Sequence, residues 1–410
     1  MKRKFELPSA VEFIINKINS AGHRADVVGG PVRDFLLGER PHDYDITTSA
    51  RPEEIKAIFA DFRTVDTGIK HGTVTLVMDG ENYEITTYRI DGEYKDSRHP
   101  ESVEFTKNLA EDLARRDFTM NAIAYNPTDG IEDRFNGEKD IAQKIIRAVG
   151  EPKKRFTEDA LRILRGIRFS AVLGFEIEEQ TAQAMRECKE LLSGISAERI
   201  FVEWKKLLSG DHSYEVIEKH RDIIEVFLPE ISGVDLPERE AFYSAEPIIR
   251  QICLFAPLGD GAKKYREAMI RLKTDAATRD VGALVLSARG EYDLRCASSV
   301  KIMMNELGAD VARASLKLKC ALGKISIGES EAVDNILAAK EPYRISDLDI
   351  NGADALFMGF KGSLVGAALK ELILAVINGE IKNERASLLR ALAEIKKKYG
   401  IKDETPKKRI

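Results

Sequence analysis

Two aspartates separated by one residue are the strongest candidates for chemistry in this sequence. Asp43 and Asp45 occur in the run Asp43-Tyr44-Asp45-Ile46. If this run is a strand, residues i and i+2 point to the same face, and the two carboxylates converge. Paired carboxylates repel each other, and Mg²⁺, which prefers oxygen ligands, would relieve that repulsion. The pattern alone also fits a solvated surface turn, so its meaning depends on the segments around it.

A glycine turn precedes these aspartates and favours the chemical interpretation. Val27 and Val28 are followed by Gly29-Gly30, and Pro31 suits the first position of a helix. The free amides and the positive end of such a helix suit a phosphate, and Arg33 adds a cation. Together with the aspartates, this turn predicts phosphoryl transfer, in which a pair of metal ions aids both the attacking and the leaving oxygen.

A third carboxylate candidate lies in the strand-like run that ends at Arg89. Glu84 would share a face with Thr86 and could join the metal site. An exposed strand glutamate without a ligand is the plain alternative.

The segment 112–122 is unusually dense in charged and amide side chains. Arg116 could grip triphosphate oxygens through its planar guanidinium. Asp117 and Asn121, at positions i and i+4, could reach a ribose hydroxyl or a phosphate. Surface ion pairs on a helix remain the alternative interpretation.

The segment 155–172 has the pattern of one helix, with Thr157 as its cap. Asp159, Arg162 and Arg165 would lie along one side, beside a stripe that packs inward. An aspartate and an arginine together could read the amino group and ring nitrogen of cytosine or adenine. Uracil and guanine would leave those groups unpaired, at a cost of roughly 1–3 kcal/mol each. Ion pairs within the helix are again the alternative. The inward stripe consists of Leu161, Leu164, Ile167 and Phe169.

The elements that must position these residues follow from periodicity and turn residues. A capping-box pattern and apolar spacing predict a first helix over about 9–21. Beyond about 140 the patterns become helical. The expected fold class is therefore α+β: a head with a small mixed sheet flanked by helices, followed by an all-helical remainder. The strands are expected at 25–28, 44–47, 72–78, 83–88 and 103–105.

Composition restricts the remaining classes. The chain has 410 residues, 43% hydrophobic and 32% charged, with a net charge of −5, which argues against indiscriminate binding along nucleic acid. Its four cysteines are scattered without a Cys-x-x-Cys pair, so we expect no zinc site and no disulfide framework. No apolar run approaches the roughly 20 residues of a membrane span. We therefore expect no membrane partner and a cytoplasmic location.

Four segments together carry a resemblance to a known family. In order and spacing they resemble the class II tRNA nucleotidyltransferases, the bacterial CCA-adding enzymes in particular. The likeness is weakest between about 210 and 340. The segments are GGPVRDFLLGERPHDYDITTSA, GIKHGTVTLVMDGENYEITTYRIDGEYKDSRHPESVEF, DLARRDFTMNAIAYN and RFTEDALRILRGIRFSAVLGF.

The resemblance implies an activity and a role for each candidate residue. The activity would be template-independent addition of CCA to tRNA from CTP and ATP, with release of pyrophosphate. Asp43 and Asp45 would be catalytic and bind Mg²⁺, with Glu84 as a further metal candidate. The implied nucleotide-binding residues are Gly30, Arg33, Arg116, Asp159, Arg162, Arg165 and Arg168.

The resemblance also implies a domain order and leaves alternatives open. We expect a catalytic head at 1–140, a base-selecting neck at 141–210, a body at 211–320 and a tRNA-binding tail at 321–410. The segment 91–100 is expected to move and to help the switch from C to A. An A-adding or CC-adding specialist, a poly(A) polymerase and a noncatalytic RNA-binding protein remain alternatives. The oligomeric state is not predicted.

Overall fold

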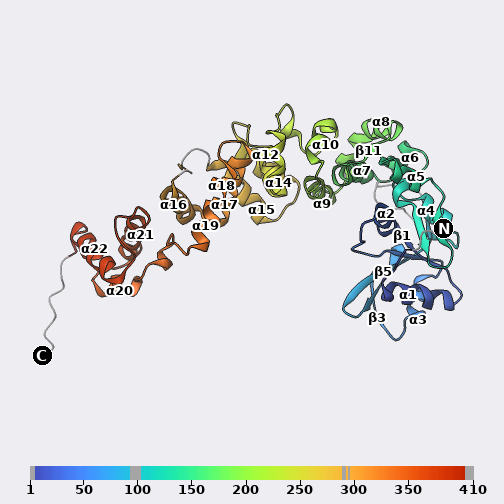
Figure 1. Cartoon of the computed structure of the whole chain (residues 1–410), viewed down its shortest axis with the longest axis horizontal. Helices are drawn as coiled ribbons and strands as arrows, with labels where there is room; N and C mark the ends of the chain where they lie inside the picture. Colours follow the sequence, from blue (N-terminus) through green and yellow to red (C-terminus); the bar gives the residue numbers. More distant parts are fainter. Residues whose placement is uncertain (1–4, 93–102, 289–291, 294–295, 402–410) are drawn as a thin grey trace. The chain divides into compact units, whose positions relative to one another are not determined.

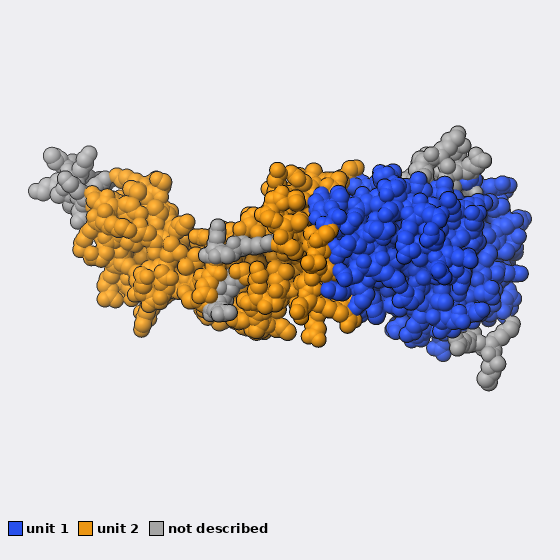
Figure 2. Space-filling model, turned by 90° about the horizontal axis from the view of Figure 1, so that it is seen from above, with its two compact units in different colours: residues 1–232 blue, residues 233–410 orange. Residues whose placement is uncertain are grey.

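The computed structural model describes residues 5–92, 103–288, 292–293 and 296–401. The chain divides into two compact units, residues 1–232 and 233–410 (Figure 2). The segments that carry the candidate catalytic and nucleotide-binding residues, including the segment 155–172, all belong to the first unit. The expected mobile segment 91–100 lies almost wholly outside the described residues.

The first unit is built on a seven-stranded mixed sheet (Figure 1). The strand order is β3-β4-β5-β2-β1-β8-β9, and only the β2–β5 pair is parallel. The strands are β1 (Ala25–Val28), β2 (Ile46–Thr48), β3 (Arg63–Gly68), β4 (Thr73–Met78), β5 (Glu81–Thr87), β8 (Ile123–Asn126) and β9 (Gly130–Asp133). The sequence predicted β1, β2, β4 and β5 to within a few residues, but not β3, β8 and β9.

Two short ladders accompany the main sheet. β6 (Arg89–Asp91) pairs with β7 (Val103–Phe105), and β10 (Ile145–Ile146) pairs with β11 (Glu176–Ile177). The second ladder is a small strand element in a region expected to be purely helical. Local sequence explains some turns: Asp79 and Gly80, both with positive φ, close the β4–β5 hairpin, as an Asp-Gly pair favours.

Helices flank the sheet and form the rest of the unit. The first helix, α1, buries Val11, Ile14, Ile15 and Ile18 on one face, as its sequence spacing predicted. The helices of this unit are α1 (Ser9–Ser20), α2 (Gly30–Leu37), α3 (Pro52–Ile58), α4 (Leu109–Ala114), α5 (Gly137–Ala142), α6 (Pro152–Glu158), α7 (Leu161–Leu173), α8 (Glu179–Cys188), α9 (Ala197–Leu208), α10 (Ser213–Lys219) and α11 (Arg221–Ile224).

Helix α7 packs tightly against the head at Gly166. A Cβ there would lie 2.3 Å from the Met185 methyl carbon and 2.9 Å from the Phe118 ring. Because Phe118 precedes the head strand β8 and Met185 lies on α8, glycine lets three segments meet at this point.

The second unit is helical throughout its described part. Two buried clusters hold it together, one around Met303 and Leu316 and one around Phe360 and Leu372. Its helices are α12 (Arg239–Tyr243), α13 (Pro247–Cys253), α14 (Gly261–Arg271), α15 (Ala276–Ser287), α16 (Ala297–Leu307), α17 (Ala309–Ala321), α18 (Ile327–Ser330), α19 (Ala332–Ala338), α20 (Gly352–Phe357), α21 (Ser363–Ile377) and α22 (Arg385–Lys398).

The α+β fold class is confirmed: a mixed sheet in the head and helices elsewhere. The boundaries near 140, 210 and 320 stay predictions; the two compact units of the chain meet at residue 232. Among the described residues, no helix combines the length and apolar character needed to cross a membrane.

Candidate active site

A glycine turn joins β1 to α2. Gly29, the N-cap of α2, has φ 78° and ψ −124°, a backbone conformation that side chains other than glycine rarely adopt. A Cβ on Gly29 would also lie 3.2 Å from an Arg116 guanidinium nitrogen. Pro31 opens the helix, and its first turn has no acidic residue. The turn therefore brings free amides and Arg116 together, as a phosphate-binding site requires.

The two aspartates lie at the entrance to β2, beside this turn. The strand begins at Ile46, one residue after Asp45, rather than at Tyr44 as predicted. The ladder nevertheless continues, because the Val28 amide donates to the Asp45 carbonyl at 3.0 Å. Asp45 is therefore held in an extended segment next to the end of β1.

A cavity of about 200 Å³ opens on this face of the sheet and is lined by Asp45, Glu84 and Arg116. The position of Glu84 follows from the parallel β2–β5 register, in which Ile46 is opposite Ile85. Asp45 precedes Ile46 and Glu84 precedes Ile85, so Asp45 and Glu84 lie next to each other across the two strands. No group of three or more potential ligands is arranged around one metal position among the residues described. Glu84 as a third metal ligand therefore stays a prediction.

The electrostatics of Asp45 reflect its crowded position. Although the residue keeps accessible surface, partial burial of its carboxylate raises its pKa, and the nearby charge of Asp43 raises it further. Arg116 acts in the opposite direction. The pair thus carries repulsion that a cation could relieve.

Asp112 positions the two neighbouring arginines of the cavity. It is fully buried at the end of α4, and it accepts hydrogen bonds from Arg115 at 2.7 Å and Arg116 at 3.3 Å. Burial alone would raise the pKa of Asp112, but the arginines outweigh burial and hold it below its ordinary value. Asp112 and Arg115 were not among the predicted site residues. The available signal was the spacing of Asp112 from Arg115 (i, i+3) and from Arg116 (i, i+4).

Asp117 and Asn121 connect the phosphate turn to helix α7. Asp117 accepts from Arg165 at 2.7 Å and from the Asn121 amide at 3.2 Å. Asn121 in turn accepts from Arg33 at 2.9 Å. Burial opposes ionisation of Asp117, yet Arg165 outweighs it and lowers its pKa to about 2. Asp117 thus forms a buried ion pair with a distant arginine, rather than a surface ion pair on a helix, because it lies outside the helices of this segment.

Three arginines surround the ring of Phe169 on α7. The guanidinium carbons of Arg168, Arg33 and Arg165 lie 3.8, 5.3 and 5.5 Å from the ring centre. Arg168 also pairs with Glu203 of α9 at 2.6 Å. The aromatic ring therefore holds cations from α2 and α7 close together, and the ion pair with Glu203 fixes one of them.

The predicted single helix over 155–172 is wrong. It is broken into α6 and α7 at Asp159, whose backbone is extended (φ −143°, ψ 103°). The Asp159 carboxylate accepts from the Leu161 amide at 3.1 Å, a local bond that competes with helical hydrogen bonding. Thr157 is not a cap either: it lies within α6 and donates to the Lys153 carbonyl at 2.8 Å. The inward stripe from Leu161 to Phe169 is buried as predicted.

The structure gives the two predicted base-reading residues separate partners. Asp159 accepts from Arg199 at 2.8 Å. Arg162 is buried and donates to Glu158 at 2.8 Å and to the Arg115 carbonyl at 2.9 Å. Asp159 and Arg162 therefore do not lie on one helical face. Arg199, which lies 40 positions from Asp159, was not predicted.

Comparison with known proteins identifies the class. Residues 25–147 match the family model of the poly A polymerase head domain. Residues 174–233 match the model described as a probable RNA- and SrmB-binding site of polymerase A. The head is thus that of a nucleotidyltransferase, and an RNA-binding module follows it.

Individual relatives define the family more closely. The chain is 37% identical to the CCA-adding enzyme of Streptococcus suis over 390 residues, 92% of this chain and 94% of that protein. It is 49% identical to the CCA-adding enzyme of Lactobacillus helveticus over 225 residues, 55% of this chain and 54% of that one. The crystal structure of the Bacillus stearothermophilus CCA-adding enzyme in complex with CTP has a TM-score of 0.75 at 31% identity, covering 96% and 99% of the chains.

The chain belongs to the family of CCA-adding enzymes, which are tRNA nucleotidyltransferases. The family resemblance predicted from four sequence segments is confirmed. A poly(A) polymerase, one of the alternatives, is not favoured by these relatives.

Proposed function

We propose that this chain adds the 3′-terminal CCA to tRNA, without a template, from CTP and ATP, and releases pyrophosphate. The observation that carries the proposal is the similarity to a CCA-adding enzyme along 92% of the chain. The geometry supports it, because Asp45, the glycine turn and Arg116 border one place on the sheet.

Asp43 and Asp45 would hold the divalent metal ions, which we propose to be Mg²⁺, with Glu84 as a further candidate. Their carboxylate oxygens are the ligands that Mg²⁺ prefers. The raised pKa of Asp45, caused by burial and then by Asp43, supports a site that lacks a full counter-charge. When bound, the ions would activate the attacking hydroxyl and stabilise the leaving oxygen.

The residues around the metal site would bind and orient the nucleotide. The amides at Gly30 and the guanidiniums of Arg33 and Arg116 would hold the triphosphate. In support, the Nε atom of Arg116 is buried without a hydrogen-bond partner in the described part of the chain. The 3′ hydroxyl of tRNA would then attack the α-phosphate, and the protein would supply position and charge.

Base selection would use Asp159 and Arg162, with Arg165 and Arg168 contributing to the base and its phosphates. In the structure Asp159 is bonded to Arg199, and Arg162 to Glu158. We propose that both exchange these partners when a nucleotide enters. Cytosine and adenine offer the amino group and ring nitrogen that such a pair can read.

The second unit would contribute contacts to tRNA. Leu356 and Phe357, at the end of α20, are 57% and 94% exposed. An exposed aromatic ring is a suitable stacking surface for an RNA base. We propose these two residues as part of the tRNA-binding surface.

The activity can be tested with purified protein, Mg²⁺ and tRNA transcripts that end before the CCA, after C or after CC. Labelled CTP, ATP, UTP and GTP are supplied separately and together. The expected result is addition that stops after the terminal A and is absent in an Asp43→Ala/Asp45→Ala variant. Addition of A to CC ends alone would make it an A-adding specialist, and of C alone a CC-adding one. Long A tails, or no incorporation, would contradict the proposal.

A further inference from the structure

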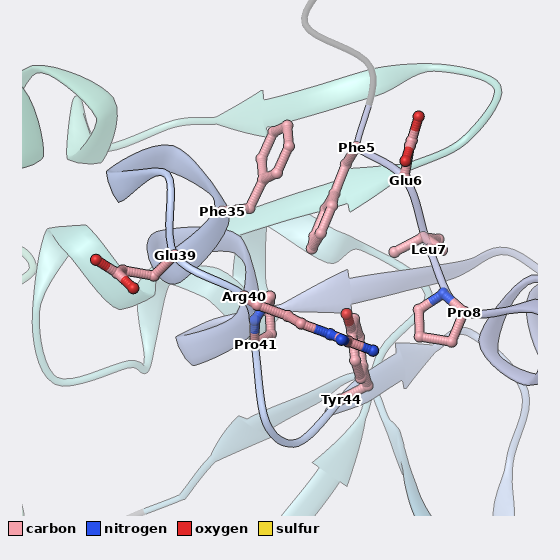
Figure 3. Close-up of a pocket in the computed structure, with 9 residues that line it drawn as sticks. All are labelled: Phe5, Glu6, Leu7, Pro8, Phe35, Glu39, Arg40, Pro41 and Tyr44. Atoms are coloured by element: carbon pink, nitrogen blue, oxygen red, sulfur yellow. The ribbon is translucent and has the colours of Figure 1, made fainter.

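Phe5 is buried, although it lies ahead of the first helix and far in sequence from the site residues. Its side chain is 3% exposed. Its ring is stacked on that of Phe35, with centres 4.1 Å apart and planes inclined by 17°. The rings of Tyr125 and Tyr44 lie 5.2 and 6.3 Å away. Phe5 therefore joins three segments of the head through one aromatic cluster, of which Figure 3 shows Phe5, Phe35 and Tyr44.

The backbone of Phe5 is fixed to the central sheet. Its amide donates to the Tyr125 hydroxyl at 3.1 Å, and that hydroxyl donates to the Phe5 carbonyl at 3.3 Å. Tyr125 lies on β8, opposite Val27 of β1. The position of the Phe5 ring is therefore set by the sheet that also sets the glycine turn.

The two other partners of Phe5 belong to the two halves of the candidate site. Phe35 lies on α2, two residues after Arg33. Contact with the Phe35 ring therefore connects Phe5 to the proposed phosphate-binding helix. Tyr44 lies between Asp43 and Asp45. A movement of the Tyr44 backbone would displace both carboxylates, because Asp43 and Asp45 are its direct neighbours in the chain.

A cavity of about 570 Å³ borders the connection between these halves. Phe5, Phe35, Arg40 and Tyr44 are among its lining residues, and Arg40 extends towards Tyr44 (Figure 3). The loop that carries Arg40 and Tyr44 thus lacks close packing on this side. The ring of Phe5 is one of the contacts that restrain Tyr44 on this side, in addition to the backbone hydrogen bond between Asp45 and Val28.

We propose that Phe5 is a positioning residue: it holds the Asp43–Asp45 segment in register with α2, so that the carboxylates face the phosphate-binding turn. The proposal rests on the proposed function of that site. Phe5 itself would not contact the substrates. Substitutions that remove its ring should therefore lower kcat and raise the Mg²⁺ requirement more than they weaken tRNA binding.

The test compares Phe5→Ala, Phe5→Leu and Phe5→Tyr with wild type, and uses Phe13→Ala as a matched control. Phe13 is a half-exposed aromatic residue of α1 whose ring contacts Phe62 instead. For Phe5→Ala we expect kcat to fall by about 10²-fold, the usual cost of an ångström-scale misplacement. The Mg²⁺ concentration for half-maximal activity should rise, and Phe5→Tyr should restore most of the activity.

Two measurements without turnover complete the test. Hydrogen exchange should become faster at residues 38–46 in Phe5→Ala while the amides of α1 remain unchanged. The tRNA dissociation constant should stay near that of wild type. If Phe5→Ala does not fold, Phe5→Leu, which keeps most of the buried volume without the ring, provides the same comparison.

Phe5 variants with the kcat and Mg²⁺ requirement of the Phe13→Ala control, and with unchanged exchange at 38–46, would overturn the positioning role. Failure of the proposed function is distinguishable, because the wild-type protein would then add no nucleotide. The hydrogen-exchange comparison would still show whether Phe5 restrains the segment.

Discussion

Individual residues of the site are positioned by charged partners buried beneath them. Asp112 is the main example, since one fully buried carboxylate accepts from Arg115 and Arg116 and also contacts the Thr47 hydroxyl at 3.3 Å. A buried carboxylate is favourable only when such partners compensate the loss of water. The orientation of the cavity arginines therefore depends on a residue that need not touch the nucleotide.

Replacement of Asp112 tests this dependence. In Asp112→Asn the arginines lose their common counter-charge, so we expect KM for CTP and ATP to rise by about tenfold and the protein to lose roughly 3 kcal/mol of stability. Steady-state kinetics and urea unfolding measure both. Asp129→Asn, which removes the exposed partner of Arg24, is the control and should change little. Equal kinetics in the two variants would contradict the role of Asp112.

His220 should make the stability of the folded protein depend on pH. It is buried at the end of α10, and burial, followed by the nearby Lys219 and Arg186, lowers its pKa to about 4. In an unfolded chain a histidine has a pKa of about 6.5. Between these values only the unfolded state binds the proton, so stability should fall as pH falls from about 6.5 to 4, by at most about 3 kcal/mol.

Unfolding of wild type and His220→Gln at pH 7 and pH 5 checks this expectation. The variant should lose less stability between the two pH values than wild type does. The exposed His42, changed to Gln, is the control and should keep the wild-type pH dependence. A His220→Gln protein with an unchanged pH dependence would exclude His220 as the cause.

At the scale of elements, close packing joins helix α7 to the head. Gly166 allows α7 to contact Phe118 and Met185, and Asp117 and Arg165 add an ion pair between the same two parts. The apolar contacts at Gly166 and the ion pair of Arg165 thus lie next to each other on α7. Asp159 separates α6 from α7 because its backbone is extended.

A methyl group at Gly166 should disturb this packing. We expect Gly166→Ala to destabilise the first unit by about 1–3 kcal/mol, the usual cost of overpacking. Gly366→Ala, at a helical position with no atom within 4 Å of the added Cβ, should be neutral or slightly stabilising. Thermal unfolding of both variants makes the comparison. If Gly166→Ala is as stable as wild type, Met185 has moved aside without cost.

At the scale of the whole molecule, both compact units have proposed tasks. The first would hold the nucleotide and also contains nearly all of the segment that matches an RNA-binding family model, and the second, which exposes Leu356 and Phe357, would add contacts to tRNA. The net charge of −5 implies that RNA binding relies on local surfaces rather than on overall attraction.

Phe357 provides the corresponding test. Stacking of an RNA base on an aromatic ring contributes roughly 1–3 kcal/mol, so Phe357→Ala should raise KM for tRNA by about tenfold. KM for CTP should stay unchanged, because the nucleotide site lies in the other unit. Ile327→Ser, at another exposed apolar residue of the second unit, is the control. An unchanged KM for tRNA in Phe357→Ala would rule out this contact.

The sequence by itself determined the family resemblance and most of the local elements, and it offered candidate residues for the chemistry. The glycine turn could be predicted because backbone conformation depends on near neighbours in the chain, whereas the strand predicted at Asp43 and Asp45 begins only at Ile46. The family resemblance rested on the same segments. Their roles in catalysis and binding remain predictions for the experiments described above.

Only the tertiary structure decided which partner each charged residue takes. Arg165 pairs with Asp117 across 48 positions, and Arg162 reaches the Arg115 carbonyl across 47. Periodicity defines the face of an element but not the segment that packs against it. The break at Asp159 has the same cause: the helical pattern continues through it, whereas its side chain accepts from the Leu161 amide at the start of α7 and pairs with Arg199 on α9.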